Sequence, residues 1–268
     1  MTGFSADWLS LREPYDLRAR NPKVLAAVAA AVAPLPSLTI VDLACGTGST
    51  LRALAPHFPV RQNWKLVDND LSLLARAANA SHSHATITAT AIDLARDLEL
   101  ALDGAVDLVT TSALLDLVSD DWLERLVTEC AARRLPLYAA LSYDGRIELE
   151  PVHPFDSAIV AAVNEHQRRD KGFGPALGPA AASQTTMRLR AVGYKVVQDT
   201  ADWLFGANDR DIQISTLDGW AAAARELDRL PLAEIMAWLT HRREAVADGR
   251  SSIRVGHIDV FADPIGLR

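Results

Sequence analysis

The chain has 268 residues, of which 49% are hydrophobic and 23% charged, and its formal net charge at pH 7 is −7. This composition is typical of a globular protein with one large domain, and the acidic balance argues against a nucleic-acid partner, which usually meets a basic face. No apolar run is long enough to span a bilayer, and no secretory leader opens the chain. Cys45 and Cys130 are too few for a disulfide framework or a thiolate metal site, so we expect no metal and a cytoplasmic location.

Two helices are expected before the first strand. Residues 6–20 can form a short helix, and we expect Pro14 to break it. A second helix begins at Pro22, because Asn21 is a good N-cap and proline suits the first helical position, and it ends near residue 34.

The most informative stretch is 38–51, which reads LTIVDLACGTGSTL. An apolar strand ends in Asp42, a turn of small residues with Gly46 and Gly48 follows, and a helix then begins. Glycines let the backbone approach a ligand closely, and a helix N-terminus offers free N–H groups. The dinucleotide-binding pattern G-x-G-x-x-G is not met, because Leu51 stands where the third glycine would be.

Four more strands follow, separated by helix-like segments, and this alternation predicts a parallel sheet with helices on both faces. The fifth strand is expected to end at Tyr143, and its nearly continuous apolar run is typical of a strand buried on both faces. Ligands of such sheets bind at the carboxyl ends of the strands. The predicted strands are 64–68, 85–91, 106–111 and 136–142, and the predicted helices between them are 71–78 and 119–134.

The second half predicts further helices and two strands. Residues 201–205 either continue the first of these strands or line a ligand site, and Ser215 or Thr216 is expected to cap a helix that ends at Leu227. The other predicted helices are 156–170, 180–192 and 232–247, and the predicted strands are 194–198 and 252–262.

The pattern acid-x-x-x-Gly-x-Gly, which runs here from Asp42 to Gly48, resembles the first motif of the class I S-adenosylmethionine-dependent methyltransferases. The resemblance implies an α/β fold, a doubly wound and mostly parallel seven-stranded sheet with an antiparallel last strand. It implies a single methyltransferase domain over 1–268, with an N-terminal helical cap at 1–20 and a substrate-side insert at 150–180.

The resemblance also assigns the cofactor, S-adenosyl-L-methionine, to residues at the strand ends. Asp68 would bind the ribose hydroxyls, Asp93 the adenine amine, and Leu94 would stack on the ring; Asp93 could equally cap a helical turn. Ser112 and Ala113 would leave room for the methionine end. The full predicted set is Asp42, Ala44, Cys45, Gly46, Thr47, Gly48, Asp68, Asn69, Asp93, Leu94, Ser112 and Ala113.

Candidates for catalysis and substrate binding are fewer. Asp116, Tyr143 and His166 are the candidate catalytic groups, although methyl transfer needs no base when the acceptor is acidic. Tyr15 of the cap and the loop residues Arg168 and Arg169 could bind substrate, the arginines through a carboxylate or phosphate. Each arginine could instead be a solvated helix end.

The sequence therefore predicts a methyltransferase that acts on a small, acidic molecule, with the methylated atom open. The Asn/Asp-Pro-Pro-aromatic motif of amino-directed nucleic-acid methyltransferases is missing, since Ser112-Ala113-Leu114-Leu115 stands in its place. The alternatives are a non-catalytic or regulatory cofactor-binding protein of the same fold and, further off, a nucleotide-dependent oxidoreductase.

Overall fold

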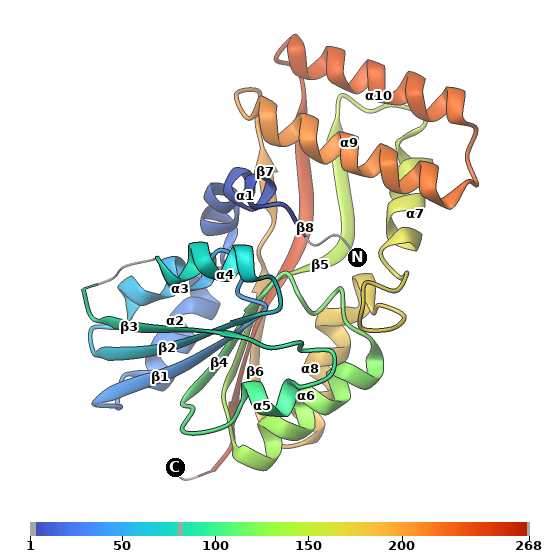
Figure 1. Ribbon diagram of the computed structural model, residues 1–268. Coiled ribbons are helices and arrows are strands. Elements are labelled where there is room, and N and C mark those ends of the chain that lie inside the picture. Colours follow the sequence, from blue (N-terminus) through green and yellow to red (C-terminus); the bar gives the residue numbers. More distant parts are fainter. Residues whose placement is uncertain (1–3, 80–82, 267–268) are drawn as a thin grey trace.

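The protein is described by a computed structural model over residues 4–79 and 83–266. Its elements alternate between strands and helices for the first half of the chain and end in a helical pair and a long strand (Figure 1). The strands are β1 (Ser37–Leu43), β2 (Arg61–Asp68), β3 (Ala85–Ala91), β4 (Leu108–Ser112), β5 (Leu137–Glu150), β6 (Tyr194–Thr200), β7 (Trp203–Phe205) and β8 (Ser252–Pro264). The α-helices are α1 (Ala6–Ala19), α2 (Pro22–Val32), α3 (Ser49–Leu54), α4 (Leu71–Ala78), α5 (Leu98–Ala101), α6 (Asp120–Arg133), α7 (Asp156–His166), α8 (Ala181–Ala191), α9 (Arg210–Leu227) and α10 (Leu232–Ala247), with short 3-10 turns at Ala55–His57 and Gly178–Ala180.

All strands belong to one twisted sheet with the order β3-β2-β1-β4-β5-β8-β6, and β7 pairs with β8 off this path. The first five strands pair in parallel, whereas β8 runs antiparallel to β5, β6 and β7. The predicted doubly wound, mostly parallel sheet with an antiparallel last strand is therefore confirmed. Over the described residues the structure has one more strand than predicted, because residues 203–205 form the separate strand β7 instead of extending β6.

Helices cover both faces of the sheet, and each layer has its own apolar core. On one face, α2, α3 and α4 bury Val28, Leu51 and Leu74 against the sheet. On the other, α5, α6 and α8 bury side chains such as Leu98 and Leu126. Central strands covered on both sides explain the near-continuous apolar runs of β1 and β5. The carboxyl ends of the parallel strands are the edge that neither layer closes.

A third apolar core lies beyond that edge. The fifth strand was expected to end at Tyr143, but β5 continues to Glu150, paired with β8 through two register shifts. These extensions carry β7, α7, α9 and α10, which bury Ile159, Ile212 and Trp238 together. The prediction was wrong because the run after Tyr143 is polar on one side, and only the packing of distant helices makes it a strand.

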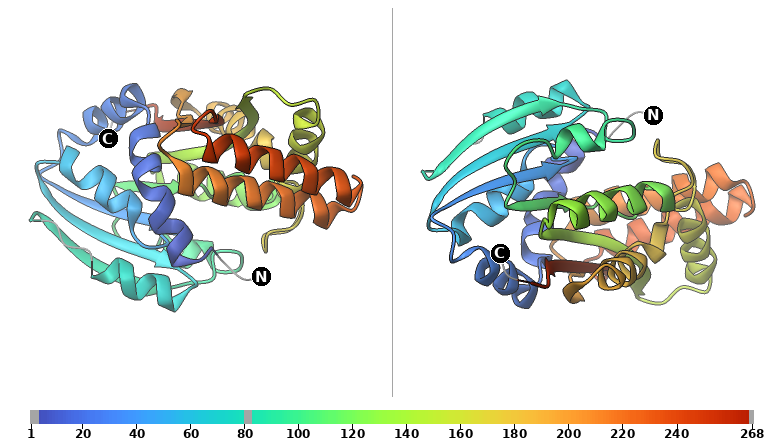
Figure 2. Two further views of the ribbon diagram at one scale, coloured as in Figure 1. Left: turned by 90° about the horizontal axis from the view of Figure 1, so that it is seen from above. Right: turned by 90° about the horizontal axis from the view of Figure 1, so that it is seen from below.

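The expected break of the first helix at Pro14 is also wrong, because α1 passes through it. Proline removes one backbone N–H and crowds the preceding turn. Here Pro14 and Ser10, whose carbonyl loses its partner, are exposed, so water can satisfy that group. Trp8 and Leu11 pack against the third core and hold the helix in place. Seen from above, α1 lies between α4 and the α9–α10 pair (Figure 2, left).

Helix α9 begins at Arg210 with Asp209 as its N-cap, about two turns before the predicted caps. The Asp209 carboxylate accepts the Gly206 N–H at 2.8 Å, which closes the turn ahead of the helix. Ile212 and Thr216 are buried on its inner side. Thr216, offered as a cap by the sequence, is instead a cavity-facing residue of the second turn. Among the described residues, no helix combines the length and apolar character that a membrane span requires.

Candidate functional site

A cavity of about 1170 Å³ opens at the carboxyl ends of β1, β2, β4 and β5. Its floor is the turn after β1 together with Asp68 and Asn69 after β2. Helix α1 contributes Trp8 and Arg12, and α9 and the extension of β8 close the far side. A single drug-sized ligand usually fills a site of 300–1,000 Å³, so this space suits a cofactor and a second small molecule together.

The turn after β1 is built so that the main chain faces the cavity. Ala44, Gly46 and Gly48 have left-handed φ values of 53°, 54° and 85°. Gly46 lines the cavity, and a Cβ placed on it would lie 3.3 Å from Cδ1 of Leu9 in α1. Only glycine therefore leaves both the backbone conformation and the space at this point free.

Asp68 ties this turn to the end of β2. Its Oδ2 accepts the Gly46 N–H at 2.8 Å and its Oδ1 accepts the Asp70 N–H at 3.0 Å. The side chain lines the cavity although the residue is only 9% exposed. A carboxylate has about four acceptor positions, so two remain for hydroxyl groups of a ligand. This geometry fits the ribose role predicted from the sequence.

Of the predicted cofactor residues, the structure brings most to the cavity lining: Ala44, Cys45, Gly46, Thr47, Asp68, Asn69, Leu94, Ser112 and Ala113. Ala113 at the end of β4 and Leu141 in β5 also take left-handed φ values, 51° and 54°. Such conformations cost free energy for residues other than glycine and concentrate at functional sites.

Three predicted cofactor residues lie outside the lining. Gly48 caps α3 beneath the turn. Asp93 is exposed, and its Oδ1 accepts the Ala95 N–H at 3.1 Å, which is the capping role that the sequence left open. Asp42 is fully buried below the turn, where its Oδ1 accepts the Thr110 hydroxyl at 2.7 Å and its Oδ2 has no partner among the described residues.

Burial raises the pKa of Asp42 to about 7, although the Thr110 hydrogen bond and the charge of Arg20 lower it. Arg20 is buried at the α1–α2 junction and donates to the Tyr138 and Ser112 hydroxyls at 3.3 and 3.4 Å. Asp42 and Arg20 therefore do not line the cavity themselves. They lie beneath it, and Arg20 contacts the lining residue Ser112.

Asp116 is the catalytic candidate whose carboxylate is still available. It lines the cavity, is 5% exposed, and its Oδ1 has no partner among the described residues. Burial raises the pKa of Asp116 to about 6, while backbone N–H groups and the charges of Arg12 and Lys171 lower it. An unpaired buried oxygen of this kind is costly unless a ligand supplies the missing hydrogen bond.

The other two catalytic candidates line the cavity but are already engaged. The Tyr143 hydroxyl donates to Oδ1 of Asn164 at 2.8 Å, and burial raises the pKa of this tyrosine. His166 lies between Glu226, 2.8 Å from its Nε2, and Lys171, whose Nζ is 3.3 Å from its Nδ1. Neither group can take a proton without losing an existing partner.

The predicted substrate residues do not reach the cavity. The Tyr15 hydroxyl donates to Oδ1 of Asp209 at 2.9 Å, and its ring packs edge-on against Phe205. Arg168 and Arg169 are exposed, and Arg169 donates to the Glu226 carbonyl at 3.2 Å. The insert at 150–180 faces the cavity through other residues, namely Val163, His166, Gln167, Lys171 and Phe173.

The sequence anticipated the far wall only in part: it offered the cap at 1–20 and residues 201–205 as a possible lining, but not the contacts between them. Arg12 and Asp16 of α1 pair at 2.8 Å, and the Trp203 indole N–H donates to the other Asp16 oxygen at 2.9 Å. The Trp203 ring lies against His257 of β8, with ring centroids 4.8 Å apart and the ring planes tilted by 53°. A further signal was the Arg12-x-x-x-Asp16 spacing, which places both side chains on one helix face.

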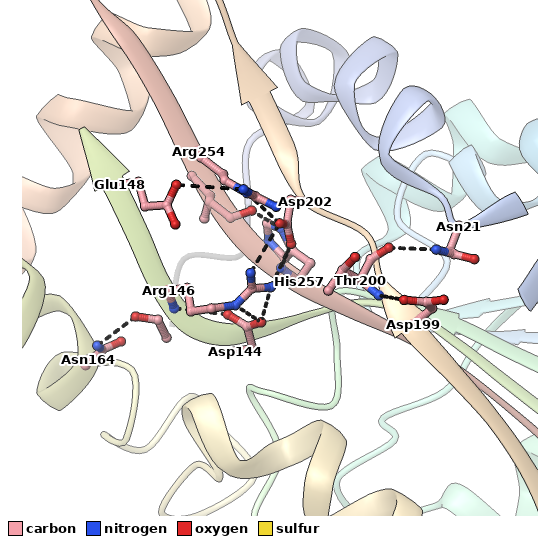
Figure 3. Close-up of polar contacts among 12 residues, drawn as sticks. Asn21, Asp144, Arg146, Glu148, Asn164, Asp199, Thr200, Asp202, Arg254 and His257 are labelled. Atoms are coloured by element: carbon pink, nitrogen blue, oxygen red, sulfur yellow. Dashed lines mark hydrogen bonds and ion pairs between the residues drawn. The ribbon is translucent and has the colours of Figure 1, made fainter. Parts of the chain in front are cut away.

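Figure 3 shows what holds His257 in place. Its backbone N–H donates to Asp202 at 3.1 Å, and Asp202 also accepts hydrogen bonds from Arg146 of β5 and Arg254 of β8. Asp144 binds the same Arg146. This network joins the extended ends of β5 and β8 behind the cavity wall. Burial lowers the pKa of His257 to about 3, so its ring is neutral.

Comparisons with known proteins agree with this geometry. Residues 40–135 match the family model of a methyltransferase domain. The chain matches no curated protein by sequence. Among solved structures it is similar to a proposed type II methyltransferase from Anaeromyxobacter dehalogenans (19% identity, 93% of this chain and 98% of that one, TM-score 0.52). It is also similar to a proposed methyltransferase from Bacillus halodurans (15%, 90% and 99%, 0.51) and to a cyclopropane synthase from Mycobacterium tuberculosis (11%, 97% and 95%, 0.50). At these identities the similarity shows the fold.

Proposed function

Because residues 40–135 match the family model of a methyltransferase domain, we propose that the chain is a class I S-adenosylmethionine-dependent methyltransferase and that it methylates an oxygen or nitrogen atom of a small molecule bound in this cavity. The observation that carries the proposal is the shared space. One cavity joins the glycine turn and Asp68 at one end to the unpaired carboxylate of Asp116.

The turn end fits the cofactor. Asp68 keeps acceptor positions for two ribose hydroxyls, Leu94 offers an apolar surface for the adenine ring, and Ser112 and Ala113 are small enough to admit the methionine end. A ligand can approach the Gly46 backbone closely because glycine has no Cβ. A larger residue is disfavoured there, since its Cβ would crowd Leu9. When bound, S-adenosylmethionine supplies an electrophilic methyl group on a sulfonium.

The protein's task is then to orient the acceptor and to remove its proton. Alignment in a water-excluding site can supply much of the rate enhancement. Asp116 would accept the hydrogen of a hydroxyl or amine through its carboxylate. It would take up the proton as the acceptor atom bonds to the methyl carbon and the carbon–sulfur bond of the sulfonium breaks, which would leave a neutral thioether. A base with a pKa of about 6 is ionised at neutral pH and remains basic enough to act.

Two measurements test the proposal separately. Calorimetry with S-adenosylhomocysteine measures occupation of the turn end, and transfer of a labelled methyl group to a panel of small phenols and amines measures catalysis. We expect both to be positive. Binding without transfer to any acceptor would favour a non-catalytic cofactor-binding protein, and absence of binding would contradict the proposal as a whole.

A further inference from the structure

Among the residues that the structure describes, Arg12 is the one buried cation on the cavity wall to which the proposed methyl transfer assigns no role. We propose that Arg12 binds the carboxylate of the substrate, which is therefore a small monocarboxylic acid with an apolar body. The inference rests on the proposed function, because it assumes that the turn end holds the cofactor. It moves the acidic-substrate recognition that the sequence placed on Arg168 and Arg169 to the opposite side of the cavity.

The guanidinium of Arg12 is held in a fixed orientation. Its Nε donates to Oδ2 of Asp16 at 2.8 Å, and Oδ1 of Asp16 is occupied by the Trp203 indole at 2.9 Å. The Arg12 Cζ lies 5.3 Å from the centroid of the Trp203 ring. Asp16 holds Nε, and Trp203 covers one face of the guanidinium. These two contacts therefore fix the orientation of the remaining edge, which carries the two terminal nitrogens.

That remaining edge has no protein partner. Arg12 is 8% exposed and lines the cavity, and across residues 4–79 and 83–266 neither terminal nitrogen makes a hydrogen bond. Neither terminal nitrogen is among the fully buried atoms, so both can be reached from the cavity. Two parallel N–H groups on a planar fork match the two oxygens of a carboxylate, and such bidentate pairs are short and strong. A ligand carboxylate would therefore complete the site.

Charge favours a carboxylate over a phosphate. Asp16 already offsets the charge of Arg12, and Asp116 adds a second acid on the same cavity. Lys171 is the other cation there, and burial lowers its pKa. One negative charge on the ligand suits this balance, whereas the second charge of a phosphate would face two carboxylates without a further partner.

The surroundings describe the rest of the ligand. The same cavity is lined by Trp203, Trp220, Val163 and Val255 of the third core, which offer aromatic and aliphatic surface. A molecule with its carboxylate on Arg12 and its hydroxyl or amine toward Asp116 would cover this surface with an apolar body. Along α1, Leu9 touches the glycine turn while Arg12 contacts Trp203 one turn later, so Arg12 lies on the substrate side.

The test uses matched acids and amides. The full chain, saturated with S-adenosylhomocysteine, is titrated by calorimetry with benzoate, phenylacetate and 4-hydroxycinnamate, and with the neutral amide of each. We expect at least one acid to bind and its amide to bind about tenfold more weakly or worse, which corresponds to about 1.4 kcal/mol. In Arg12→Lys the preference for the acid should shrink by about the same factor, because the fork is lost while the charge is kept.

Two further variants guard against misfolding and general charge effects. Arg12→Gln/Asp16→Asn removes the pair as a unit, so that no buried carboxylate is left alone, and it should abolish the preference for acids. Arg61→Lys, an exposed substitution at the opposite end of β2, should behave as the unchanged protein does. Retained affinity for S-adenosylhomocysteine shows that each variant is folded and that the turn end is intact.

The inference is overturned if no acid binds to the S-adenosylhomocysteine-loaded protein, if acids and amides bind equally, or if Arg12→Lys leaves the preference unchanged. It is also overturned if the Arg12 variants lose affinity for S-adenosylhomocysteine instead, since Arg12 would then bind the amino-acid end of the cofactor. Absence of S-adenosylhomocysteine binding by the unchanged protein would refute the proposed function itself, so the two failures are distinguishable.

Discussion

The two ends of the cavity, the turn end and the far wall, differ in the kind of groups that line them. The turn end presents backbone N–H groups, small residues and Asp68, from the segments that follow β1, β2 and β4. The far wall presents large side chains, Arg12, Trp203, Trp220 and His257, from α1, β7, α9 and β8. The shape of a surface made of main chain and small residues depends little on side-chain identity, so it fits one ligand. The shape and charge of a wall made of large side chains change with each substitution. The first arrangement suits an invariant cofactor and the second a selective substrate.

The ends also differ in how they are held. At the turn end, left-handed conformations at Ala44 and Gly46 fix the backbone. At the far wall, a chain of contacts from Arg12 through Asp16 to Trp203 fixes the side chains. Substitutions at the turn end should therefore act on cofactor affinity, and substitutions at the wall on the choice of substrate.

The largest effect is expected where the two ends meet, at Asp116. Asp116→Asn keeps the shape but cannot accept a proton, so methyl transfer should fall by roughly 10²–10⁴-fold while S-adenosylhomocysteine affinity is unchanged. In the unchanged protein the rate should fall as pH drops through about 6, where the carboxylate becomes protonated, and this dependence should be absent in the variant. Initial rates between pH 5 and pH 8 provide the measurement. Full activity in Asp116→Asn would remove Asp116 from the chemistry.

The next largest effect is expected at the turn. Gly46→Val adds a β-branched side chain where φ is 54° and Leu9 is 3.3 Å away, so S-adenosylhomocysteine affinity should fall by roughly 100-fold or more. Gly104→Val is the matched control, because Gly104 also has a left-handed φ, 95°, but lies in open space away from the cavity. Both variants should lose stability in thermal unfolding, and only Gly46→Val should lose the ligand. Equal affinities would place the cofactor elsewhere.

Asp68 and Asp93 allow a sharper comparison within the turn end. Asp68→Ala should weaken S-adenosylhomocysteine binding by about 1–3 kcal/mol, since two ribose hydroxyls lose their acceptor and the Gly46 N–H loses its partner. Asp93→Ala removes an exposed carboxylate outside the cavity, and the affinity should change little. Calorimetry on both variants decides the matter. A larger loss in Asp93→Ala would restore the adenine contact that the sequence predicted.

The smallest effect concerns stability. The raised pKa of Asp42, about 7 in the folded protein against 3.8 ordinarily, means that the native state keeps a proton which the unfolded chain has lost. The contribution of Asp42 to the free energy of unfolding should therefore decrease as pH rises from about 4 to about 7 and stay constant above.

Asp42→Asn should remove this slope. It should also raise the free energy of unfolding above pH 7 by about 1 kcal/mol. The variant no longer buries a negative charge, but part of this gain is lost because the new amide is left without a hydrogen-bond partner. Urea unfolding of both proteins at several pH values measures the difference. A difference that does not vary with pH would show that Asp42 is ionised throughout this range.

Much of the turn end could be predicted from the sequence, because its signals are local. The strand, acid and glycine turn at 38–51, and Asp68 directly after an apolar run, needed only neighbouring residues to be recognised. The exposed position of Asp93 could not be predicted from the sequence, because an acid that follows a strand can face the cavity or cap the next turn. The path of the backbone after the strand determines which of the two occurs.

The far wall was not predictable in the same way. Asp16 and Trp203 meet across 187 residues, and no local pattern links them. The continuation of α1 through Pro14 and of β5 beyond Tyr143 depends on packing against the third core, which overrides local propensity. Exposed arginines at 168 and 169 gave a stronger sequence signal than Arg12, yet Arg12 is the one that reaches the cavity.

The most direct test of the central claim is a crystal structure of the chain with S-adenosylhomocysteine. We expect the ribose hydroxyls within hydrogen-bonding distance of Asp68 and the adenine ring against Leu94. We expect the sulfur atom near Ser112, with the side that would carry the methyl group facing Asp116. A ligand bound at another surface, or a cavity that stays closed to it at saturating concentration, would contradict the assignment.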